Sequence, residues 1–303
     1  MDLIICNTPL QIIQIEKLIT NGIIKEKNFY FVFFVCNETE KLKYYYDRLA
    51  KLSKDSLYYK YQKFPFYIFS LRKIFKKNKY ENIYTASVDN KLIHYILSFT
   101  QFNGLYTIDD GAANIWNKSN YYINKKSTLK KLVHQALGCK FDLEKTKKRI
   151  NTHYTIYKDM PNITKYTKYN NPFPQYKQKN HIIESEVNIY LGTVYNEITY
   201  DKSALLDSLN NFFDKKNFFC ISHPRDTFRY FDNLNYIEGN EIAEEIILNL
   251  LEKYSRVNLY GFGSSVQFNL LKIDGIQNYQ FTSSKLKFNI NIENHFLKKI
   301  DLD

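Results

Sequence analysis

The stretch LIICNTPLQ at residues 3–11 joins a short apolar run directly to the start of a helix. The run LIIC has the length and composition of a buried strand. Thr8 suits the N-cap of the following helix, Pro9 its first position, and Gln11 can complete a capping box. A buried strand that leads within a few residues into a capped helix predicts the first unit of an α/β fold.

The same alternation continues through the first half of the chain. Strand-sized apolar runs are separated by longer helical segments. The runs cover residues 29–36, 83–86 and 105–108, and the helical segments cover residues 37–52, 66–77 and 90–99. Strands that alternate with helices indicate a parallel, doubly wound sheet.

The pattern breaks at residues 162–185, which are polar and contain Pro172 and Pro174, as is typical of a linker. It then resumes, with strands expected at 187–191, 217–221, 257–262 and, as the last strand, 276–281, and helices at 205–213 and 241–254. The sequence therefore predicts an α/β domain at 1–161, a linker at 162–185 and an α/β domain at 186–303. We expect a ligand cleft between the two domains.

Composition excludes several classes of protein. The 303 residues fit two domains, and a hydrophobic content of 44% is enough for sizeable cores. The four cysteines show no disulfide or zinc spacing, and no apolar run approaches the ~20 residues that span a bilayer. We therefore expect a cytoplasmic protein and exclude transmembrane, fibrous and disulfide-rich secreted classes.

The formal net charge is +12, but no nucleic-acid-binding motif accompanies it, so we expect no nucleic-acid partner. Lysines concentrate at residues 72–79 and 125–149. Such stretches are typical of a solvated face, and they also fit peripheral contact with the anionic inner face of the cytoplasmic membrane.

Candidate chemical groups follow the strands of both halves. Ligands of open α/β sheets bind beyond the carboxyl ends of the strands, so side chains at these positions are the candidates for chemistry. They are Asp109 and Asp110, Gly192 with the loop to Glu197, His223, and the turn at 263–265. Taken alone, Asp109-Asp110-Gly111 also fits a plain turn, and the turn at 263–265 also fits a capped helix start.

The DxD pattern and five of the histidines receive no functional assignment. The DxD pattern occurs at residues 301–303, the extreme C-terminus, so we predict no metal site. The histidines in helical, linker or polar contexts receive no role; they are His94, His134, His153, His181 and His295.

The order of the short motifs resembles the bacterial sialyltransferases of glycosyltransferase family 52, the lipooligosaccharide sialyltransferase family. Besides the opening stretch, the matching motifs are IYTAS at 83–87, DDGAANI at 109–115, HYTIYKDMPNI at 153–163, IYLGT at 189–193, SHPR at 222–225, AEEIIL at 243–248 and LYGFGSS at 259–265. The resemblance implies a GT-B-type fold, in which two Rossmann-like domains face a central cleft. It also implies inverting, metal-independent transfer of sialic acid from CMP-sialic acid, without a cofactor.

The resemblance also implies roles for individual residues. His223 would protonate or stabilise the departing CMP phosphate, and Ser264, with the backbone of Gly263 and Ser265, would hold that phosphate. The residues expected around the nucleotide are Gly192, Pro224, Arg225, Ala243 and Glu244.

The base that activates the acceptor hydroxyl stays open. Asp109 is the first candidate, because such acidic-acidic-Gly motifs supply the base in related bacterial sialyltransferases. The family also has an Asp in the loop after its LGS motif, and Tyr195 occupies that position here. Glu197 lies nearby and is the rival candidate, with Asp110 behind both.

The resemblance leads us to expect O3 of a terminal galactose on lipooligosaccharide or a capsular glycan as the acceptor. Two alternatives stay open. One is another GT-B glycosyltransferase that uses a UDP-sugar, and the other is a non-catalytic basic protein that binds membranes or polysaccharide. A homodimer also stays open.

Overall fold

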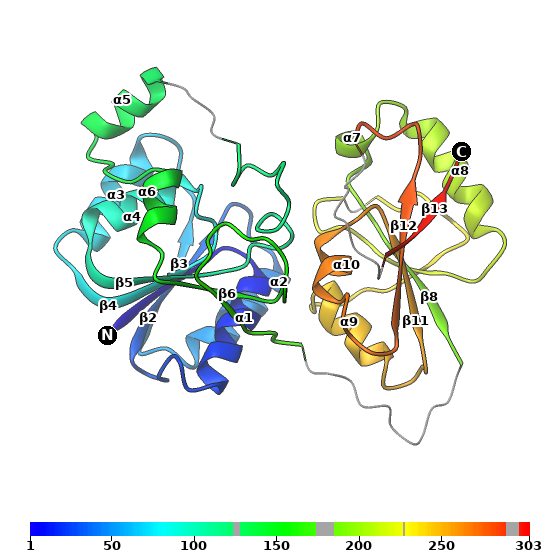
Figure 1. Cartoon of the computed structure of the whole chain (residues 1–303), viewed down its shortest axis with the longest axis horizontal. Coiled ribbons are helices and arrows are strands. Elements are labelled where there is room, and N and C mark those ends of the chain that lie inside the picture. Colours follow the sequence, from blue (N-terminus) through cyan, green and yellow to red (C-terminus); the bar gives the residue numbers. More distant parts are fainter. Residues whose placement is uncertain (124–127, 174–184, 227, 289–296) are drawn as a thin grey trace. The chain divides into compact units, whose positions relative to one another are not determined.

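The computed structural model describes residues 1–123, 128–173, 185–226, 228–288 and 297–303. The chain divides into two compact units, Met1–Pro172 and Phe173–Asp303. Each unit contains one parallel sheet with helices packed against it (Figure 1). The predicted α/β class and parallel sheets are therefore confirmed.

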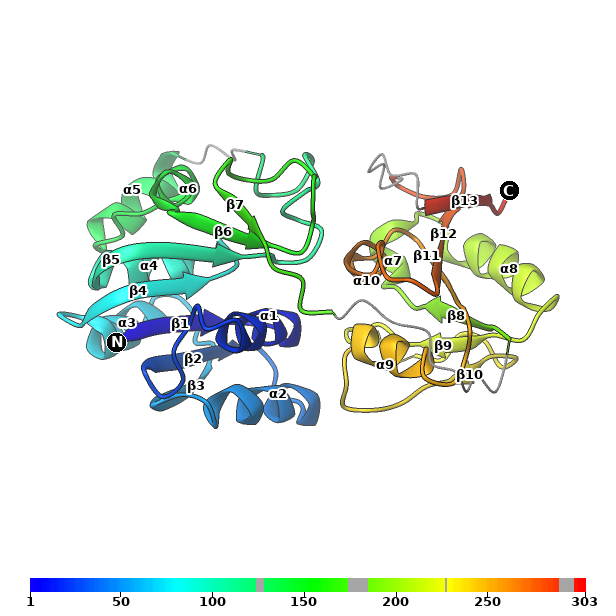
Figure 2. The same ribbon diagram turned by 60° about the horizontal axis from the view of Figure 1, so that its bottom comes forward.

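The first unit contains a seven-stranded sheet in the order β3-β2-β1-β4-β5-β6-β7, which Figure 2 shows from one edge to the other. Its strands are β1 (Asp2–Cys6), β2 (Phe29–Val35), β3 (Asp55–Lys60), β4 (Lys79–Thr85), β5 (Gln101–Ile108), β6 (Thr152–Thr155) and β7 (Thr167–Tyr169). Its helices are α1 (Pro9–Thr20), α2 (Glu40–Ala50), α3 (Phe66–Phe75), α4 (Lys91–Phe99), α5 (Thr128–Ala136) and α6 (Leu143–Arg149).

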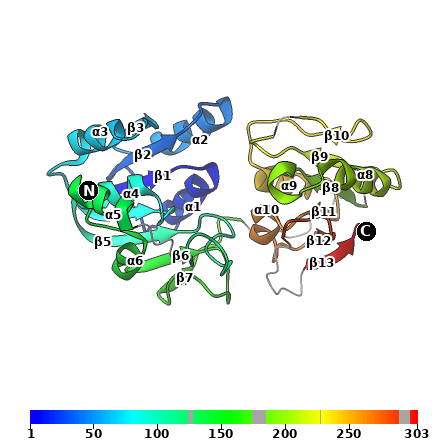
Figure 3. The same cartoon turned by 90° about the horizontal axis from the view of Figure 1, so that it is seen from above.

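Helices cover both faces of this sheet, which explains why its central strands are apolar. Helices α1 and α2 pack together on one face and α3 and α4 on the other (Figures 1 and 3). Strand β1 is buried at every position, and β2 at six of its seven positions. A strand covered on both sides needs apolar residues at consecutive positions, and that need accounts for the runs seen in the sequence.

The second unit contains a six-stranded sheet in the order β10-β9-β8-β11-β12-β13. Its strands are β8 (Val187–Leu191), β9 (Phe219–Ile221), β10 (Asn235–Tyr236), β11 (Val257–Gly261), β12 (Ile276–Thr282) and β13 (Leu297–Asp301). Its helices are α7 (Tyr195–Ile198), α8 (Lys202–Phe213), α9 (Ala243–Leu250) and α10 (Ser265–Asn269). The core is rich in aromatic rings, with Tyr190, Phe213, Phe218 and Phe281 almost fully buried.

Several strands differ from the sequence-based expectation. The prediction that 276–281 is the last strand is wrong, because β13 follows it and pairs with it in parallel. Strand β7 lies inside the segment predicted as a linker and pairs with β6; residues 174–184 of that segment lie outside the described residues. Five strands were not predicted. Strands β3, β7, β10 and β13 are edge strands, where one side is open and apolar runs are not required, and β6 is a short interior strand with the polar sequence THYT.

The predicted capping box at α1 is displaced by one residue. The Thr8 side chain accepts a hydrogen bond from the Gln11 N–H, as expected for an N-cap. However, the Gln11 side-chain oxygen accepts from the N–H of Asn7, at 2.6 Å, instead of the N–H of Thr8. The Gln11 amide group can therefore donate elsewhere. Among the described residues, no helix has the length and apolar character needed to cross a membrane.

Candidate active site

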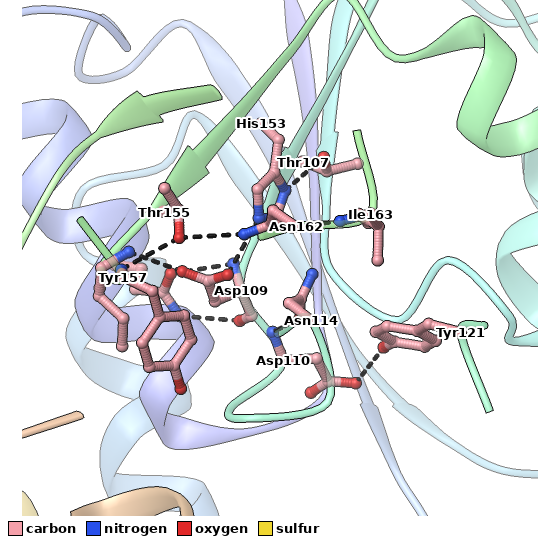
Figure 4. Close-up of polar contacts among 12 residues, drawn as sticks. Thr107, Asp109, Asp110, Asn114, Tyr121, His153, Thr155, Tyr157, Asn162 and Ile163 are labelled. Carbon is pink, nitrogen blue, oxygen red and sulfur yellow. Dashed lines mark hydrogen bonds and ion pairs between the residues drawn. The ribbon is translucent and has the colours of Figure 1, made fainter. Parts of the chain in front are cut away.

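Asp109, directly after β5, is completely buried and both of its carboxylate oxygens are bonded (Figure 4). Oδ1 accepts from His153 Nε2 at 2.9 Å, and Oδ2 accepts from the Ile156 N–H at 2.6 Å. His153 is also fully buried, and its Nδ1 lies 2.8 Å from the Thr107 hydroxyl. Because an ionised carboxylate only accepts, His153 carries a proton on Nε2.

The backbone of Asp109 is held as firmly as its side chain. Its N–H donates to Gln14 Oε1 at 3.1 Å, and its carbonyl accepts from Gln14 Nε2 at 2.9 Å. Gln14 is a buried residue of α1. Asp109 therefore joins the end of β5 to α1 and to the end of β6, and it presents no open side to a substrate in this arrangement.

Asp110 is half-buried and bonds to a different set of side chains. Its Oδ1 accepts from Gln11 Nε2 at 2.8 Å, and its Oδ2 accepts from the hydroxyls of Ser87, at 2.9 Å, and Tyr121, at 2.7 Å. Burial, and next the negative charge of Asp110, raise the pKa of Tyr121 well above its usual value. The Tyr121 hydroxyl therefore stays protonated and acts as a donor to Asp110. The Asp110 N–H donates to Asn114 Oδ1 at 2.7 Å.

His223 follows β9 in the second unit and is held in one tautomer. Its Nδ1 accepts the backbone N–H of Arg225 at 3.1 Å, so Nε2 carries the proton of the neutral ring. Burial, and next the positive charge of Arg225, lower the pKa of His223 below its usual value. At neutral pH the side chain is therefore an uncharged donor through Nε2.

Glu197, on α7, forms a bidentate ion pair with Arg225, with N–O distances of 2.7 and 2.9 Å. The hydrogen bond from Arg225 lowers the pKa of Glu197, although both side chains are more than half exposed. Tyr195, the residue at the family's Asp position, is buried, and its hydroxyl lies 2.6 Å from that of Tyr190. Glu197 is thus the carboxylate of this loop that reaches solvent.

A hollow lies beside His223, and aromatic side chains form much of its wall. Its lining includes Gly192, His223, Asp226, Phe228, Tyr230 and Tyr236. At Gly192, a Cβ atom would lie 3.1 Å from the His223 backbone nitrogen and 3.2 Å from the Ile221 carbonyl oxygen. A residue without a side chain therefore lets the end of β8 approach the end of β9 closely.

The turn after β11 has a positive φ of 80° at Gly263, which favours glycine. The side-chain oxygen of Gln267 accepts from the N–H groups of Gly263 and Ser264, so this intramolecular contact occupies the Gly263 N–H, one of the two backbone groups expected to hold a phosphate. The Ser264 hydroxyl accepts from the Gln267 N–H, and a hydroxyl that accepts can still donate to an anion. Ser265 is the first residue of α10 and is exposed.

The predicted nucleotide contacts on α9 differ in their exposure. Ala243 begins the helix and is half-buried, whereas Glu244 is only 5% exposed. Glu244 Oε1 accepts from Asn269 Nδ2 at 2.7 Å, which ties α9 to α10. Pro224, between His223 and Arg225, is exposed. No cluster of three or more potential metal ligands occurs within the described ranges.

Comparison with known proteins identifies the family. The model of glycosyltransferase family 52 matches residues 26–284. The chain belongs to glycosyltransferase family 52. The match spans both units and includes every motif on which the resemblance rests except the opening stretch.

Two relatives match almost the whole chain. Over 285 residues it is 28% identical to a CMP-N-acetylneuraminate:beta-galactoside alpha-2,3-sialyltransferase of Pasteurella multocida, covering 91% of this chain and 90% of the relative. Over 288 residues it is 28% identical to an N-acetyllactosaminide alpha-2,3-sialyltransferase of Haemophilus influenzae, again covering 91% and 90%.

The fold also has a solved counterpart. The S. aureus MnaA structure with UDP superposes with a TM-score of 0.53 over 94% of this chain and 79% of that chain, at 9% identity. At that identity the likeness concerns the fold alone. Two Rossmann-like units, each with a parallel sheet, agree with the expected GT-B-type architecture.

The sequence predicted the candidate site residues at the strand ends, but it did not predict the residues that hold them in place. The structure brings Gly192, Glu197, His223 and Arg225 together in the second unit. In the first unit it adds residues that had been given no role, namely Gln14, Ser87, Tyr121 and His153. Ser87 and His153 belong to the motifs IYTAS and HYTIYKDMPNI, so the motifs carried a signal that isolated residue types did not.

Proposed function

We propose that the protein is an inverting, metal-independent sialyltransferase that moves sialic acid from CMP-sialic acid to O3 of a terminal galactose. The observation that carries this proposal is the likeness to two alpha-2,3-sialyltransferases over 91% of the chain. The expected acceptor is a galactose-terminated lipooligosaccharide or capsular glycan. No cofactor is needed, since the nucleotide sugar already carries an activated leaving group.

The second unit would bind the donor and stabilise the departing CMP. As the bond between the anomeric carbon and the phosphate oxygen breaks, negative charge grows on the phosphate. An uncharged His223 that donates through Nε2 suits this task, because the second pKa of a phosphate monoester is about 6 and full protonation is not required. The Ser264 hydroxyl supplies a second donor.

The remaining residues expected around the nucleotide support this role in different ways. Gly192 allows close backbone approach beside His223. Glu244, tied to Asn269, would fix the start of α9 near the nucleotide, with Ala243 beside it. Pro224 and Arg225 would shape the same pocket, and Arg225 also forms an ion pair with Glu197.

The acceptor hydroxyl needs a carboxylate base that can reach it. Both oxygens of Asp109 are engaged inside the first unit, which disfavours the first candidate from the sequence. Glu197 is accessible but paired with Arg225, and this pairing lowers its pKa and its strength as a base. Asp110 is half-buried and is the third candidate.

The first unit would also attach the enzyme to an anionic membrane surface, where a lipid-linked acceptor resides. Leu129, Leu132 and Val133 occupy one face of α5 and are 76%, 56% and 44% exposed, while His134 on the opposite face contacts Tyr95. Lys130 and Lys131 of α5 supply positive charge on the same helix, and Lys131 also pairs with Asp142. An apolar stripe with neighbouring cations fits anionic lipid headgroups.

A donor screen tests the proposed function. The purified full chain is incubated with a β-galactoside and, in turn, CMP-sialic acid and a panel of UDP-sugars, with and without excess EDTA. The proposal expects turnover with CMP-sialic acid and undiminished rates in EDTA. Turnover with a UDP-sugar alone, or activity that is lost in EDTA and restored by Mg²⁺ or Mn²⁺, would contradict it.

A further inference from the structure

The crossover direction in the first sheet reverses between β1 and β4. Helix α1 follows β1 on one face and α4 follows β4 on the other, so the loops after these strands diverge. Ligands of open α/β sheets bind in the crevice outside the carboxyl ends at such a point. The polar residues at this point are therefore candidates for binding a ligand.

Residues from three strand ends meet at this point. Asn7 follows β1, Ser87 follows β4 and Asp110 follows β5. The Ser87 hydroxyl lies 2.9 Å from Asp110 Oδ2 and 3.4 Å from Asn7 Nδ2, and Gln11 reaches Asp110 Oδ1 from α1. We call Asn7, Gln11, Ser87 and Asp110 the switch-point cluster. It combines a carboxylate, a hydroxyl and two carboxamides, which can both donate to and accept from sugar hydroxyls.

We propose that the switch-point cluster binds the hydroxyl groups of the acceptor sugar, that Asp110 is the base, and that Asp109 is a positioning residue. This inference rests on the proposed function and adds the place and the chemistry of acceptor binding. Oδ1 of Asp110 receives one described hydrogen bond, from Gln11, so it keeps capacity to accept a substrate hydroxyl.

Asp109 and Asp110 are neighbours with opposite surroundings. Figure 4 shows the side chain of Asp109 directed to His153 and that of Asp110 directed to Tyr121. The Ile156 N–H also bonds to Asp109, and the Ser87 hydroxyl also bonds to Asp110. Hydrogen bonds hold both the side chain and the backbone of Asp109. Because Asp110 is the next residue, these bonds also fix the direction in which its side chain projects.

In the proposed step one bond forms, one bond breaks and one proton moves. The acceptor oxygen forms a bond to the anomeric carbon of the donor while its proton passes to Asp110. The bond from that carbon to the phosphate oxygen breaks, and CMP leaves with the electron pair. Tyr121 and Ser87 donate to Oδ2 and hold the carboxylate in place while Oδ1 takes the proton.

Single substitutions of Asp109 and of Asp110 by Asn distinguish the roles of the two residues. In Asp109→Asn the amide oxygen can accept from the Ile156 N–H, and the amide nitrogen can donate to His153 in its other tautomer. We expect this variant to keep transfer to a β-galactoside within about 10-fold of wild type. We expect Asp110→Asn to lose about 10²–10⁴-fold in kcat for transfer. The matched control is Asp207→Asn, at an exposed position of α8.

Two further readouts keep the test independent of folding and of the donor. Asp110→Asn should bind CMP with a Kd within about 3-fold of wild type, because the donor is proposed to bind the second unit, and Ser87→Ala should weaken equilibrium binding of methyl β-galactoside. Transfer retained by Asp110→Asn, loss of transfer in Asp109→Asn with its fold intact, or unchanged galactoside binding in Ser87→Ala would overturn the inference. A wild-type protein that binds the galactoside but never turns over CMP-sialic acid would instead overturn the proposed function.

Discussion

Asp109 Oδ1 and His153 Nε2 are joined by a 2.9 Å hydrogen bond between two completely buried side chains. Removing one partner of such a pair leaves a buried polar group without its bond, which costs about 1–3 kcal/mol for each group. The pair therefore matters first to the stability of the first unit, and through that stability to the placement of Asp110.

Asp109→Ala should destabilise the first unit by about 2–5 kcal/mol, because it orphans both His153 Nε2–H and the Ile156 N–H. Hydrogen exchange at the amides of β5 and β6 measures this loss within one unit of a two-unit chain. Asp110→Ala, at a half-buried position, should cost less. Equal exchange protection in Asp109→Ala and wild type would show that the pair contributes nothing to stability.

His223→Ala should lower turnover by about 10²–10⁴-fold, because it removes the Nε2 donor to the leaving phosphate. His223→Gln places an amide donor near the position of Nε2 and should recover part of the loss, since a neutral donor suffices. Steady-state kinetics with CMP-sialic acid compare the two variants. A Gln variant as inactive as the Ala variant, with both folded, would indicate that His223 must transfer a proton.

Acid should destabilise the first unit through His94. This residue is 1% exposed, donates through Nε2 to the Val88 carbonyl at 2.8 Å, and burial lowers its pKa to about 4. Because the unfolded chain binds the proton more tightly, stability is full above pH ~6.5 and falls as the pH drops towards 4, by about 3 kcal/mol in all. Thermal unfolding of His94→Gln should show a weaker loss over this range, and an identical loss in both proteins would contradict the assignment.

Membrane attachment should depend on both charge and the apolar stripe of α5. Binding to vesicles with anionic lipid should weaken as salt rises, because each cation near the surface contributes about 1 kcal/mol at low salt. Leu129→Ser with Leu132→Ser should reduce binding without affecting turnover of a soluble acceptor. The matched control is Tyr200→Ser, which removes an exposed apolar side chain from the second unit. Salt-independent binding, or no effect of the double substitution, would count against this surface.

The sequence predicted the covered strands well because burial on both faces demands continuous apolar runs. Strands β1, β2 and β11 illustrate this, whereas the edge strand β3 has mostly half-buried or exposed positions and was missed. Strand β6 is short and polar in sequence, THYT, yet it is largely buried because its polar groups find partners. Partners distant in sequence, such as Thr107 for His153, are set by strand pairing and leave no local pattern.

The candidate site shows the same limit. The positions of Asp109, His223 and Ser264 at strand ends follow from the alternation of strands and helices. The choice between Asp109 and Asp110 does not, because the residues are identical and adjacent, and only the contacts from α1, β4 and β6 distinguish them. Gln11 was expected to cap its own helix. Its contact with Asp110, 99 positions away, could not be predicted from the local sequence.

The central claim is tested most directly by determining the product made from CMP-sialic acid and a β-galactoside. Two-dimensional NMR of the purified product identifies both the sugar transferred and the position and configuration of its new linkage. The account predicts an α-linked sialic acid on O3 of the galactose, formed with inversion. A product that lacks sialic acid, or a sialic acid linked with retention of the donor's configuration, would contradict it.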